Sequence, residues 1–344
     1  MLDLYLIEHP NHHEPAWNLA MEEYVFRNLP DDKEYLLLYR NSPSVIVGRN
    51  QNIFEETNLS YLRTANIPVF RRFSGGGTVY HDLGNINFSF HTRYEPSRLH
   101  NYRFFNTPIV EMLQKAGVAA AFNERSDILV HGEKISGNAQ FSSRGRMISH
   151  GTLLFDADVN ALRNSLAVHV PYMESKSQKS VRSVVANISD VLPEKLSIEE
   201  FEQRFIASLI PEVKLKHQRV NLSEEDYKNI HTLMEEKYLD WEWIYGRNPG
   251  FTIRKKLFRG DDWCHMEVRV HKGVIERIHF DPVHQKQPFK LYIGGLKKLT
   301  GIRYTDEELE LRLCEILGNN TAISKSANRW STLLFEGEES VQLP

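Results

Sequence analysis

Cysteine is scarce in this chain of 344 residues, which contains only Cys264 and Cys314. The two lie far apart and lack the spacing of metal ligands, and the N-terminus has neither the cationic nor the apolar region of a secretory signal. We therefore expect free thiols in a reducing compartment and a cytoplasmic protein. No apolar run approaches the roughly 20 residues that span a bilayer, so no contact with a membrane is expected.

An excess of charge of one sign is also absent. The chain has 42 Lys and Arg residues against 45 Asp and Glu residues, for a net charge of -3. This balance excludes the strongly basic footprint of a nucleic-acid-binding protein, so no nucleic-acid partner is expected. Hydrophobic residues make up 41% of the sequence, which is typical of a globular protein, and the length predicts two domains rather than one.

Short apolar runs rich in β-branched and aromatic residues dominate the first half, with helical patterns between them. This texture predicts an α+β fold with α/β-like mixed sheets flanked by helices. From residue 197 onward two helices are predicted from capping boxes, Ser197 with Glu200 and Ser223 with Asp226.

A break in regular structure follows in WEWIYGRNPGF, and the next alternating segment predicts a hairpin with Lys272-Gly273 at its turn. The tail from residue 285 holds LYIGGLKKLTGI and a predicted helix, DEELELRLCEIL, which Thr305 would cap. We therefore expect a domain boundary near residue 245, with a large domain over residues 1–245 and a small α+β domain over residues 246–344.

Three consecutive glycines stand in RRFSGGGTVYHDLGN, residues 71–85, between two strand-like runs. The spacing is that of neither a dinucleotide-binding loop nor a P-loop, and a plain hairpin turn is the simplest alternative. However, glycines can expose N–H groups to an anion or let an aliphatic chain lie on the backbone, while Arg71 and Arg72 supply donors. We interpret the segment as a loop for an anionic ligand. His81 and Asp82 point to opposite faces of a strand and cannot form a catalytic dyad.

A second hairpin is predicted in SDILVHGEKISGNAQ, residues 126–140, with its turn at His131-Gly132-Glu133. A lysine in such a place is usually a surface charge, but Lys134 precedes small residues that would let a ligand approach. Its ammonium could hold a phosphate or polarise an acyl carbonyl. Asp127 on the other arm could face the same space and hold a base, a ribose or a metal. A third stretch, HGTLLF from His150, would be read alone as an ordinary strand start.

Together these stretches resemble the catalytic domain of lipoate-protein ligases of the A type, in a superfamily with biotin ligases and octanoyl transferases. The matching motifs are RRFSGGGTVYHDLGN, KISGNA, SHGTLLF and SVRSVVANISDVL, and WNLAMEEYVF, LLLYRNSPSVIVGRNQN and WEWIYGRNPGF extend the match over nearly the whole chain. The resemblance implies a biotin/lipoate-ligase-type catalytic domain over residues 1–245, which binds lipoate and ATP, and a C-terminal accessory domain. It implies that lipoate and ATP, with Mg2+, form lipoyl-AMP and pyrophosphate, after which the lipoyl group passes to a lysine of a lipoyl domain.

The resemblance also implies roles for individual residues. Lys134 would be catalytic and would stabilise negative charge at the carboxyl carbon and the α-phosphate. Residues expected to bind lipoate are Tyr39, Arg72, Ser74, Gly75, Gly76, Gly77, His81, Asn85 and His150. Residues expected to bind ATP or the adenylate are Gly77, Thr78, Val79, Asp127, Lys134, Ser136, Gly137, Thr152, Ser180, Val181, Arg182 and Ser183. Asp127 is also the candidate magnesium ligand, and residues 180–183 would be a mobile loop over the nucleotide. Tyr39 stands where many relatives have Trp, which leaves the width of the acyl tunnel open.

Three other activities compete with a complete ligase. A lipoyl or octanoyl amidotransferase needs a cysteine nucleophile, and neither cysteine lies in the catalytic half. A transferase that uses preformed lipoyl-AMP stays open, and a non-catalytic lipoate sensor is disfavoured by the presence of Lys134. The implied partners are apo lipoyl-domain proteins, namely the glycine-cleavage H protein and acyltransferase subunits of 2-oxoacid dehydrogenases. A monomer is the default expectation, and the preference for lipoate or octanoate is open.

Overall fold

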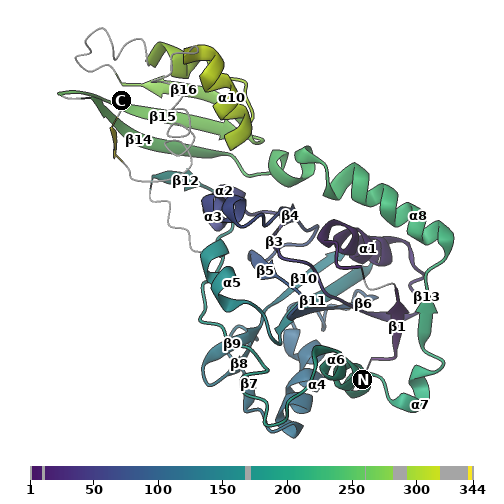
Figure 1. Ribbon diagram of the computed structural model, residues 1–344. Helices are drawn as coiled ribbons and strands as arrows, with labels where there is room; N and C mark the ends of the chain where they lie inside the picture. The colour runs from purple at the N-terminus through teal and green to yellow at the C-terminus, as the bar shows by residue number, and fades with distance from the viewer. Residues whose placement is uncertain are drawn as a thin grey trace. The chain divides into compact units, whose positions relative to one another are not determined.

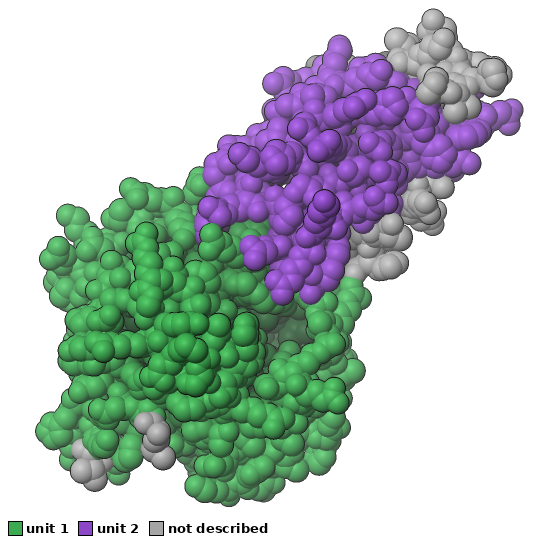
Figure 2. All heavy atoms as spheres, turned by 180° about the vertical axis from the view of Figure 1, so that it is seen from behind, with its two compact units in different colours: residues 1–49, 66–166, 180–240 green, residues 50–65, 167–179, 241–344 purple. Residues whose placement is uncertain are grey.

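The computed structural model describes residues 2–9, 12–166, 172–259, 261–281, 293–317 and 340–342. The contacts between residues divide the chain into two compact units, which Figure 2 colours separately. Unit 1 comprises Met1–Arg49, Asn66–Leu166 and Ser180–Asp240. Unit 2 comprises Asn50–Ala65, Ala167–Lys179 and Trp241–Pro344. The last change of unit, after residue 240, lies close to the expected boundary near 245, but unit 2 also takes two earlier segments that the sequence prediction assigned to the large domain.

Unit 1 is built around a six-stranded sheet with the order β10-β11-β6-β2-β1-β13 (Figure 1). Its strands are β1 (Leu4–Glu8), β2 (Glu34–Tyr39), β6 (Asn85–Arg93), β10 (Asn138–Ser143), β11 (Arg146–Leu154) and β13 (Arg219–Asn221). β1 runs parallel to β2 and β13, whereas β2, β6, β11 and β10 pair antiparallel. The sheet is therefore mixed, as the sequence predicted.

Two three-stranded sheets carry the loops of interest. One has the order β4-β3-β5, with β3 (Ser44–Val47), β4 (Val69–Arg71) and β5 (Val79–His81). The other has the order β7-β8-β9, with β7 (Ala120–Phe122), β8 (Ile128–Val130) and β9 (Glu133–Ser136). His131 and Gly132 both have positive φ between β8 and β9, which confirms the predicted hairpin turn.

The helices of unit 1 are α1 (Pro15–Asn28), α4 (Tyr102–Lys115), α5 (Val159–Leu166), α6 (Ile198–Leu209), α7 (Glu212–Leu215), α8 (Glu224–Leu233) and the π-helical η1 (Met234–Tyr238). Both predicted capping boxes are present, at Ser197 with Glu200 before α6 and at Ser223 with Asp226 before α8. In each box the serine side chain and the acidic side chain satisfy backbone N–H groups that the helix leaves unpaired.

Strand β6 separates an apolar face from a polar one. Its side chains alternate along NINFSFHT, so Ile86, Phe88 and Phe90 lie on one face, where they share a hydrophobic cluster with residues of α4 and α6. Asn85, Asn87, Ser89 and His91 therefore lie on the other face, and all four are buried. A buried polar face of a sheet needs polar partners.

Unit 2 has a sheet with the order β12-β14-β15-β16, and β17 pairs parallel with β14. Its elements are α2 (Ile53–Glu56), α3 (Leu59–Thr64), β12 (Met173–Ser175), η2 (Glu242–Gly246), β14 (Phe251–Arg259), β15 (Asp262–His271), β16 (Val274–Phe280), α10 (Asp306–Leu317) and β17 (Ser340–Gln342). Lys272 and Gly273 both have positive φ and form the predicted hairpin turn. Residues 285–292 of the expected tail lie outside the described ranges.

A separate hydrophobic cluster forms the core of unit 2, and it includes Phe54, Tyr172 and Met173 beside residues of β14, β15 and β16. These side chains explain why the two early segments belong to unit 2. The mixed sheets and their helices confirm the predicted α+β class. Within the described ranges, no helix combines the length and the apolar character needed to cross a bilayer.

Candidate active site

The β8–β9 hairpin brings Lys134 and Asp127 together. Lys134 Nζ lies 2.9 Å from Asp127 Oδ1, and the two side chains are 23% and 17% exposed. Asn123 holds the other carboxylate oxygen, because its Nδ2 donates to Asp127 Oδ2 at 3.1 Å. The ammonium is thus oriented and partly desolvated, yet open enough to exchange its carboxylate partner for an incoming anion.

Small residues surround this ammonium. A side chain at Gly137 would place a Cβ atom 3.2 Å from Lys134 Nζ, so the amine would have to shift by a few tenths of an ångström. Thr152 of β11 fixes the glycine, since Gly137 N donates to Thr152 Oγ1 at 3.3 Å and Thr152 N donates to Gly137 O at 3.0 Å. Ser136 is fully buried, and its hydroxyl has no partner among the described residues.

Arg72 holds the glycine loop through the loop's own backbone. Its Nη2 donates to Gly75 O and to Gly77 O, both at 2.7 Å, and its Nε donates to Ser74 Oγ at 3.1 Å. Burial lowers the pKa of Arg72 to about 10, so the guanidinium is cationic at neutral pH. Arg71 donates instead to Gly48 O at 3.0 Å. The structure therefore assigns both arginines backbone partners and makes Arg72 the residue that shapes the loop.

A buried chain of polar groups connects this loop to helix α1. Ser74 Oγ lies 2.9 Å from His150 Nε2, and His150 Nδ1 lies 2.9 Å from Glu22 Oε1. The Tyr39 hydroxyl donates to the same Glu22 oxygen at 3.5 Å. Burial raises the pKa of Glu22, but His150, His91 and a hydrogen bond with Ser89 together outweigh burial, and the net pKa is lower than usual. Glu22 is therefore an ionised, buried partner of two predicted site residues, His150 and Tyr39.

Glu22 was not predicted from the sequence. It is one of two adjacent acids, Glu22 and Glu23, that are buried within the otherwise apolar AMEEYVF segment of α1. Acids in that position on a core-facing helix are rarely buried without a partner, and this was the signal available. Glu23 binds Lys237, Tyr238 and Arg27.

His81 offers a free hydrogen-bonding atom to this site. Asn41 Nδ2 lies 3.0 Å from its Nδ1, whereas its Nε2 has no partner among the described residues. Burial chiefly, and the nearby Arg72 next, lower the pKa of His81 to about 3, so the ring is neutral. Asn85 Oδ1 is likewise buried without a partner in the described ranges. Unsatisfied buried atoms are costly, so both are candidate contacts for a ligand.

Asp82, beside His81, has a structural task instead. Its Oδ1 accepts from Gly84 N at 3.0 Å and its Oδ2 from Asp158 N at 2.7 Å. A Cβ atom at Gly84 would lie 1.9 Å from Asp156 O, so this turn tolerates only glycine. The two neighbours thus serve different faces, as the alternation of a strand predicts.

Strand β11 joins the two constellations. His150 and Thr152 are two residues apart and point to the same face of the strand. His150 contacts Ser74 of the glycine loop, and Thr152 contacts Gly137 beside Lys134. One strand therefore places the predicted lipoate loop and the predicted catalytic lysine on a common surface.

Segment 180–186 also reaches both constellations. Ser180 Oγ accepts from Thr78 N at 2.9 Å, next to Gly77. Val181, Arg182 and Ser183 are exposed, with Val181 at 63%. The chain then returns to β9, where Lys134 N donates to Val184 O at 2.8 Å and Ala186 N donates to Lys134 O at 3.1 Å. The exposed residues thus form a loop anchored at both ends. Val79 lies in β5, paired with Ile46.

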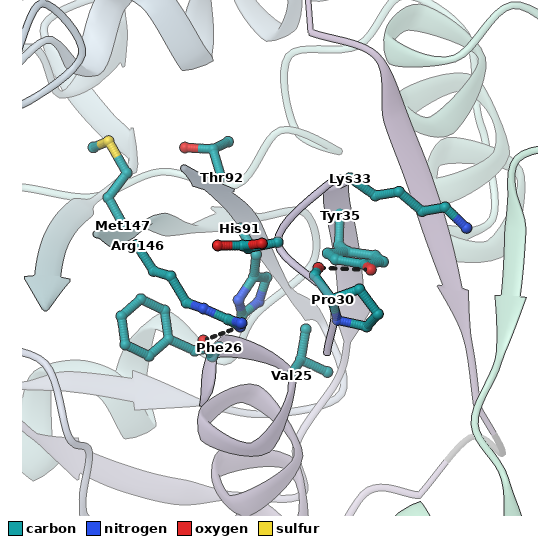
Figure 3. Close-up of a pocket in the computed structure, with 10 residues that line it drawn as sticks. Val25, Phe26, Pro30, Lys33, Tyr35, His91, Thr92, Arg146 and Met147 are labelled. Carbon is teal, nitrogen blue, oxygen red and sulfur yellow. Dashed lines mark hydrogen bonds between the residues drawn. The ribbon is translucent and has the colours of Figure 1, made fainter. Parts of the chain in front are cut away.

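A small pocket lies elsewhere in unit 1, between the end of α1 and the strands β2, β6 and β11 (Figure 3). Its lining residues include Phe26, Tyr35, His91 and Arg146, and none of them was predicted as a site residue. Arg146 donates to Phe26 O at 3.1 Å across it. Its volume of about 10 Å³ has room for roughly one water molecule, so it is not a substrate pocket.

A dedicated cluster of metal ligands and thiol chemistry have little support in the described ranges. No group of three or more His, Cys, Asp or Glu side chains there could hold a metal ion. Cys264 is buried in β15 of unit 2, and burial raises the pKa of its thiol to about 11, which makes it unsuited to hold a thioester. The side chain of Cys314 lies outside the described ones.

Comparisons with known proteins identify relatives of this chain. A family model described as the lipoyl protein ligase A/B catalytic domain matches residues 14–210. The chain is 43% identical over 283 residues to the lipoate-protein ligase LplJ of Bacillus subtilis, a match that covers 79% of this chain and 83% of that protein.

Two solved structures have folds similar to that of this chain. A crystal structure of a lipoate-protein ligase A bound with ATP has a TM-score of 0.58 and 28% identity, and the match covers 70% of this chain and 96% of that one. A bi-partite lipoate protein ligase from Thermoplasma acidophilum, analysed with its E2 lipoyl domain, has a TM-score of 0.60 and 27% identity, over 71% and 96% of the two chains. With its glycine loop, its lysine hairpin and the strand that joins them, this chain belongs to the lipoyl protein ligase A/B family.

Proposed function

We propose that this chain is a lipoate-protein ligase that activates free lipoate with ATP and then transfers the lipoyl group to a lysine of an apo lipoyl domain. The observation that carries the proposal is the common surface of β11, where His150 contacts the glycine loop and Thr152 contacts Gly137 beside Lys134. One end of this surface suits an acid with an aliphatic chain, and the other suits a phosphate.

In the first step a carboxylate oxygen of lipoate attacks the α-phosphorus of ATP. A new P–O bond forms, the bond to the β-phosphate breaks, and pyrophosphate leaves. The protein's task is to position two anions and to neutralise charge that develops between them. Lys134 does this by leaving Asp127 for the α-phosphate and the acyl oxygen.

In the second step the amine of an acceptor lysine attacks the acyl carbon of lipoyl-AMP. The C–N bond forms, the bond from the acyl carbon to the phosphate oxygen breaks, and AMP leaves while the amine proton passes to solvent. Lys134 again stabilises the negative charge on the acyl oxygen and on the departing phosphate. A single ammonium can therefore serve both steps.

Lipoate lies, in this proposal, on the backbone of Ser74, Gly75, Gly76 and Gly77. Tyr39 and His150 flank it, and the unpartnered Nε2 of His81 and Oδ1 of Asn85 are its candidate polar contacts. Arg72 contributes through the loop that it holds. ATP and the adenylate are assigned to Gly77, Thr78, Val79, Asp127, Lys134, Ser136, Gly137, Thr152, Ser180, Val181, Arg182 and Ser183.

Mg2+ fits this site through Asp127. The ion is commonly held by one or two carboxylates together with substrate phosphates, so a dedicated cluster of protein ligands is not required. Asp127 is released when Lys134 turns to the phosphate, and its orientation by Asn123 suits a ligand role. When bound, Mg2+ would neutralise charge on the phosphates.

The proposed acceptors are the glycine-cleavage H protein and the acyltransferase subunits of 2-oxoacid dehydrogenases, in the cytoplasm, with the ligase acting as a monomer. The solved relative from Thermoplasma acidophilum, analysed with its E2 lipoyl domain, supports an acceptor of the lipoyl-domain class. Comparing rates of modification of an H protein and an acyltransferase domain identifies the preferred acceptor.

The purified chain, incubated with lipoate, MgATP and an apo lipoyl domain, tests the proposal. We expect pyrophosphate release and an increase in the acceptor's mass by one lipoyl group. Modification from synthetic lipoyl-AMP but not from ATP would identify a transferase and overturn the ligase. Lipoate binding without either reaction would identify a sensor.

A further inference from the structure

Glu55 of α2 is a nearly buried carboxylate in unit 2, and its side-chain partners in the described ranges come from one segment, residues 175–179. Its side chain is only 4% exposed. Ser175 and Ser177 donate their hydroxyl groups to Glu55 Oε2, the latter at 2.7 Å, and Lys179 Nζ forms an ion pair with Glu55 Oε1. One acid thus gathers three donors.

The three donors are spaced two residues apart, as an extended chain requires for side chains on one face. Between Ser177 and Lys179, Gln178 is held by its backbone, because its N–H donates to Asn50 O at 3.3 Å and its carbonyl accepts from Gln51 Nε2 at 3.3 Å. The segment is therefore fixed against α2 and the residues that precede it.

Apolar burial does not explain why residues 175–179 are held in place. Tyr172 and Met173 are the last residues of the segment that enter the core of unit 2, and residues 174–179 include no buried side chain. Beyond the pairing of Ser175 with Phe251 at the end of β12 and the backbone contacts of Gln178, the contacts that hold residues 175–179 are those of Ser175, Ser177 and Lys179 with Glu55. Hydrogen bonds to a charged acceptor are among the stronger polar contacts, so their loss would free the segment.

Residue 179 is followed directly by the loop of residues 180–183. We propose that Glu55 is a positioning residue for this loop: by fixing residues 175–179 it limits the conformations of the four that follow and lowers the entropy cost of closing on the adenylate. The inference rests on the proposed function, in which residues 180–183 cover the nucleotide. Glu55 acts through the segment and does not touch substrate.

Kinetics of Glu55→Ala test the role. When the binding-competent loop is only partly populated, apparent affinity falls in proportion, whereas saturating ligand restores the rate. We expect the KM for ATP to rise about tenfold, with kcat and the KM for lipoate within about twofold of wild type. Glu55→Gln, whose amide oxygen still accepts from the serines, should show a smaller rise.

Lysine variants provide a matched pair on the segment. Lys179→Gln removes the ion pair with Glu55 and should raise the KM for ATP, whereas Lys176→Gln should not, because no ion pair is recorded for Lys176 in the described ranges. This pair keeps the proposal testable if Glu55→Ala fails to fold.

Limited trypsin digestion without ligands gives a readout that does not need activity. Cleavage after Arg182, identified by mass spectrometry, should be several-fold faster in Glu55→Ala and Lys179→Gln than in wild type or Lys176→Gln. Unchanged cleavage together with an unchanged KM for ATP would overturn the inference. If wild type released no pyrophosphate, the proposed function would fail. Equal cleavage rates in wild type, Glu55→Ala and Lys179→Gln would then still contradict the positioning role of Glu55.

Discussion

Lys134 differs from an ordinary surface lysine in its immediate neighbours. It contacts an acid that is itself held by Asn123, and the position beside it is a glycine that leaves the amine unobstructed. A charge fixed in this way before the substrate arrives needs little reorganisation during the reaction. The commoner interpretation, a solvated surface charge, fails because the ammonium is partly buried and oriented.

Lys134→Ala should abolish both half-reactions while leaving the fold intact. Removing a preorganised charge from a reacting centre typically costs about 100-fold or more in rate, whereas a partly exposed ion pair contributes little to stability. Pyrophosphate release from ATP, acyl transfer from lipoyl-AMP and thermal unfolding would be measured for the variant and for Lys176→Ala. A Lys134→Ala protein with wild-type rates would refute the catalytic role.

Two buried histidines, His81 and His91, should make stability depend on pH. Burial chiefly lowers their pKa values, to about 3 and about 4. In the unfolded chain both histidines take a proton near pH 6.5. Between this value and the lower pKa of each residue in the folded protein, the unfolded state therefore binds more protons than the folded state. Their contribution is therefore present above about pH 6.5 and is lost as the pH falls toward 4, by about 1.4 kcal/mol per pH unit for each residue.

Urea unfolding of wild type and His91→Gln at pH 7.5, 6.5 and 5.5 would measure this effect. The free energy of unfolding should fall less steeply with acid in the variant, whatever its absolute stability. His217→Gln, at an exposed position, serves as the control and should keep the wild-type slope. Equal slopes in all three proteins would show that His91 is not buried in its neutral form.

Strand β6 shows how one element can serve a core and a site together. Its apolar residues share the cluster with α4 and α6, while Ser89 on its polar face hydrogen-bonds Glu22 of α1. Glu22 of α1 and His150 of β11 belong to the resulting polar layer, which connects to the glycine loop through Ser74. The alternation of apolar and polar side chains along β6 thus determines which face of the sheet carries the polar layer that contacts the glycine loop.

Substitutions at different glycines of the triplet should affect either the stability of the fold or the binding of lipoate. A Cβ atom at Gly75 has nothing within 4 Å, whereas Gly76 has φ +90° and its Cβ atom would lie 2.9 Å from Arg72 Nη2. The free energy of unfolding of Gly75→Ala should therefore lie within about 1 kcal/mol of the wild-type value, while that of Gly76→Ala should be lower by about 1–3 kcal/mol. If lipoate lies on this loop, Gly75→Ala should raise the KM for lipoate and leave the KM for ATP unchanged. An unaffected KM for lipoate would argue against that placement.

The path of the chain between its two units is the main feature that concerns the whole molecule. Residues 50–65 and 167–179 belong to unit 2, although both are surrounded in sequence by residues of unit 1. Phe54, Tyr172 and Met173 of these segments lie in the core of unit 2, where the Phe54 ring is 4.9 Å from the Tyr304 ring and 5.4 Å from the Phe251 ring. A C-terminal fragment that began near residue 245 would lack part of this core.

Phe54→Ala should therefore weaken unit 2 despite its position early in the chain. Truncating a buried aromatic side chain costs about 3–5 kcal/mol. Hydrogen exchange measured by mass spectrometry should accelerate in peptides of β14, β15 and β16 more than in peptides of β6. Leu59→Ala, which removes a partly buried side chain at the edge of the same cluster, should have a smaller effect. Acceleration confined to β6 would contradict the assignment of Phe54 to unit 2.

Local signals made much of the fold predictable. The capping boxes at Ser197 and Ser223, the turn at Lys272-Gly273 and the hairpin that carries Lys134 each depend on neighbours within a few residues, and all four are present. The contact between Asp127 and Lys134 also follows from the two arms of one short hairpin. Backbone propensity and side-chain capping act over these distances, so the sequence carries the information directly.

Contacts between distant segments had no such signal. The pairing of Glu22 with His150 spans 128 residues, and the backbone role of Arg72 depends on carbonyl groups that point inward only once the loop is closed. The assignment of residues 50–65 and 167–179 to unit 2 likewise depends on which core accepts Phe54, Tyr172 and Met173. The sequence determined the family, the local elements and the chemistry of the candidate site. The tertiary structure decided which charges are buried together and which segments share a core, because burial is a property of the packed chain and not of any short stretch of it.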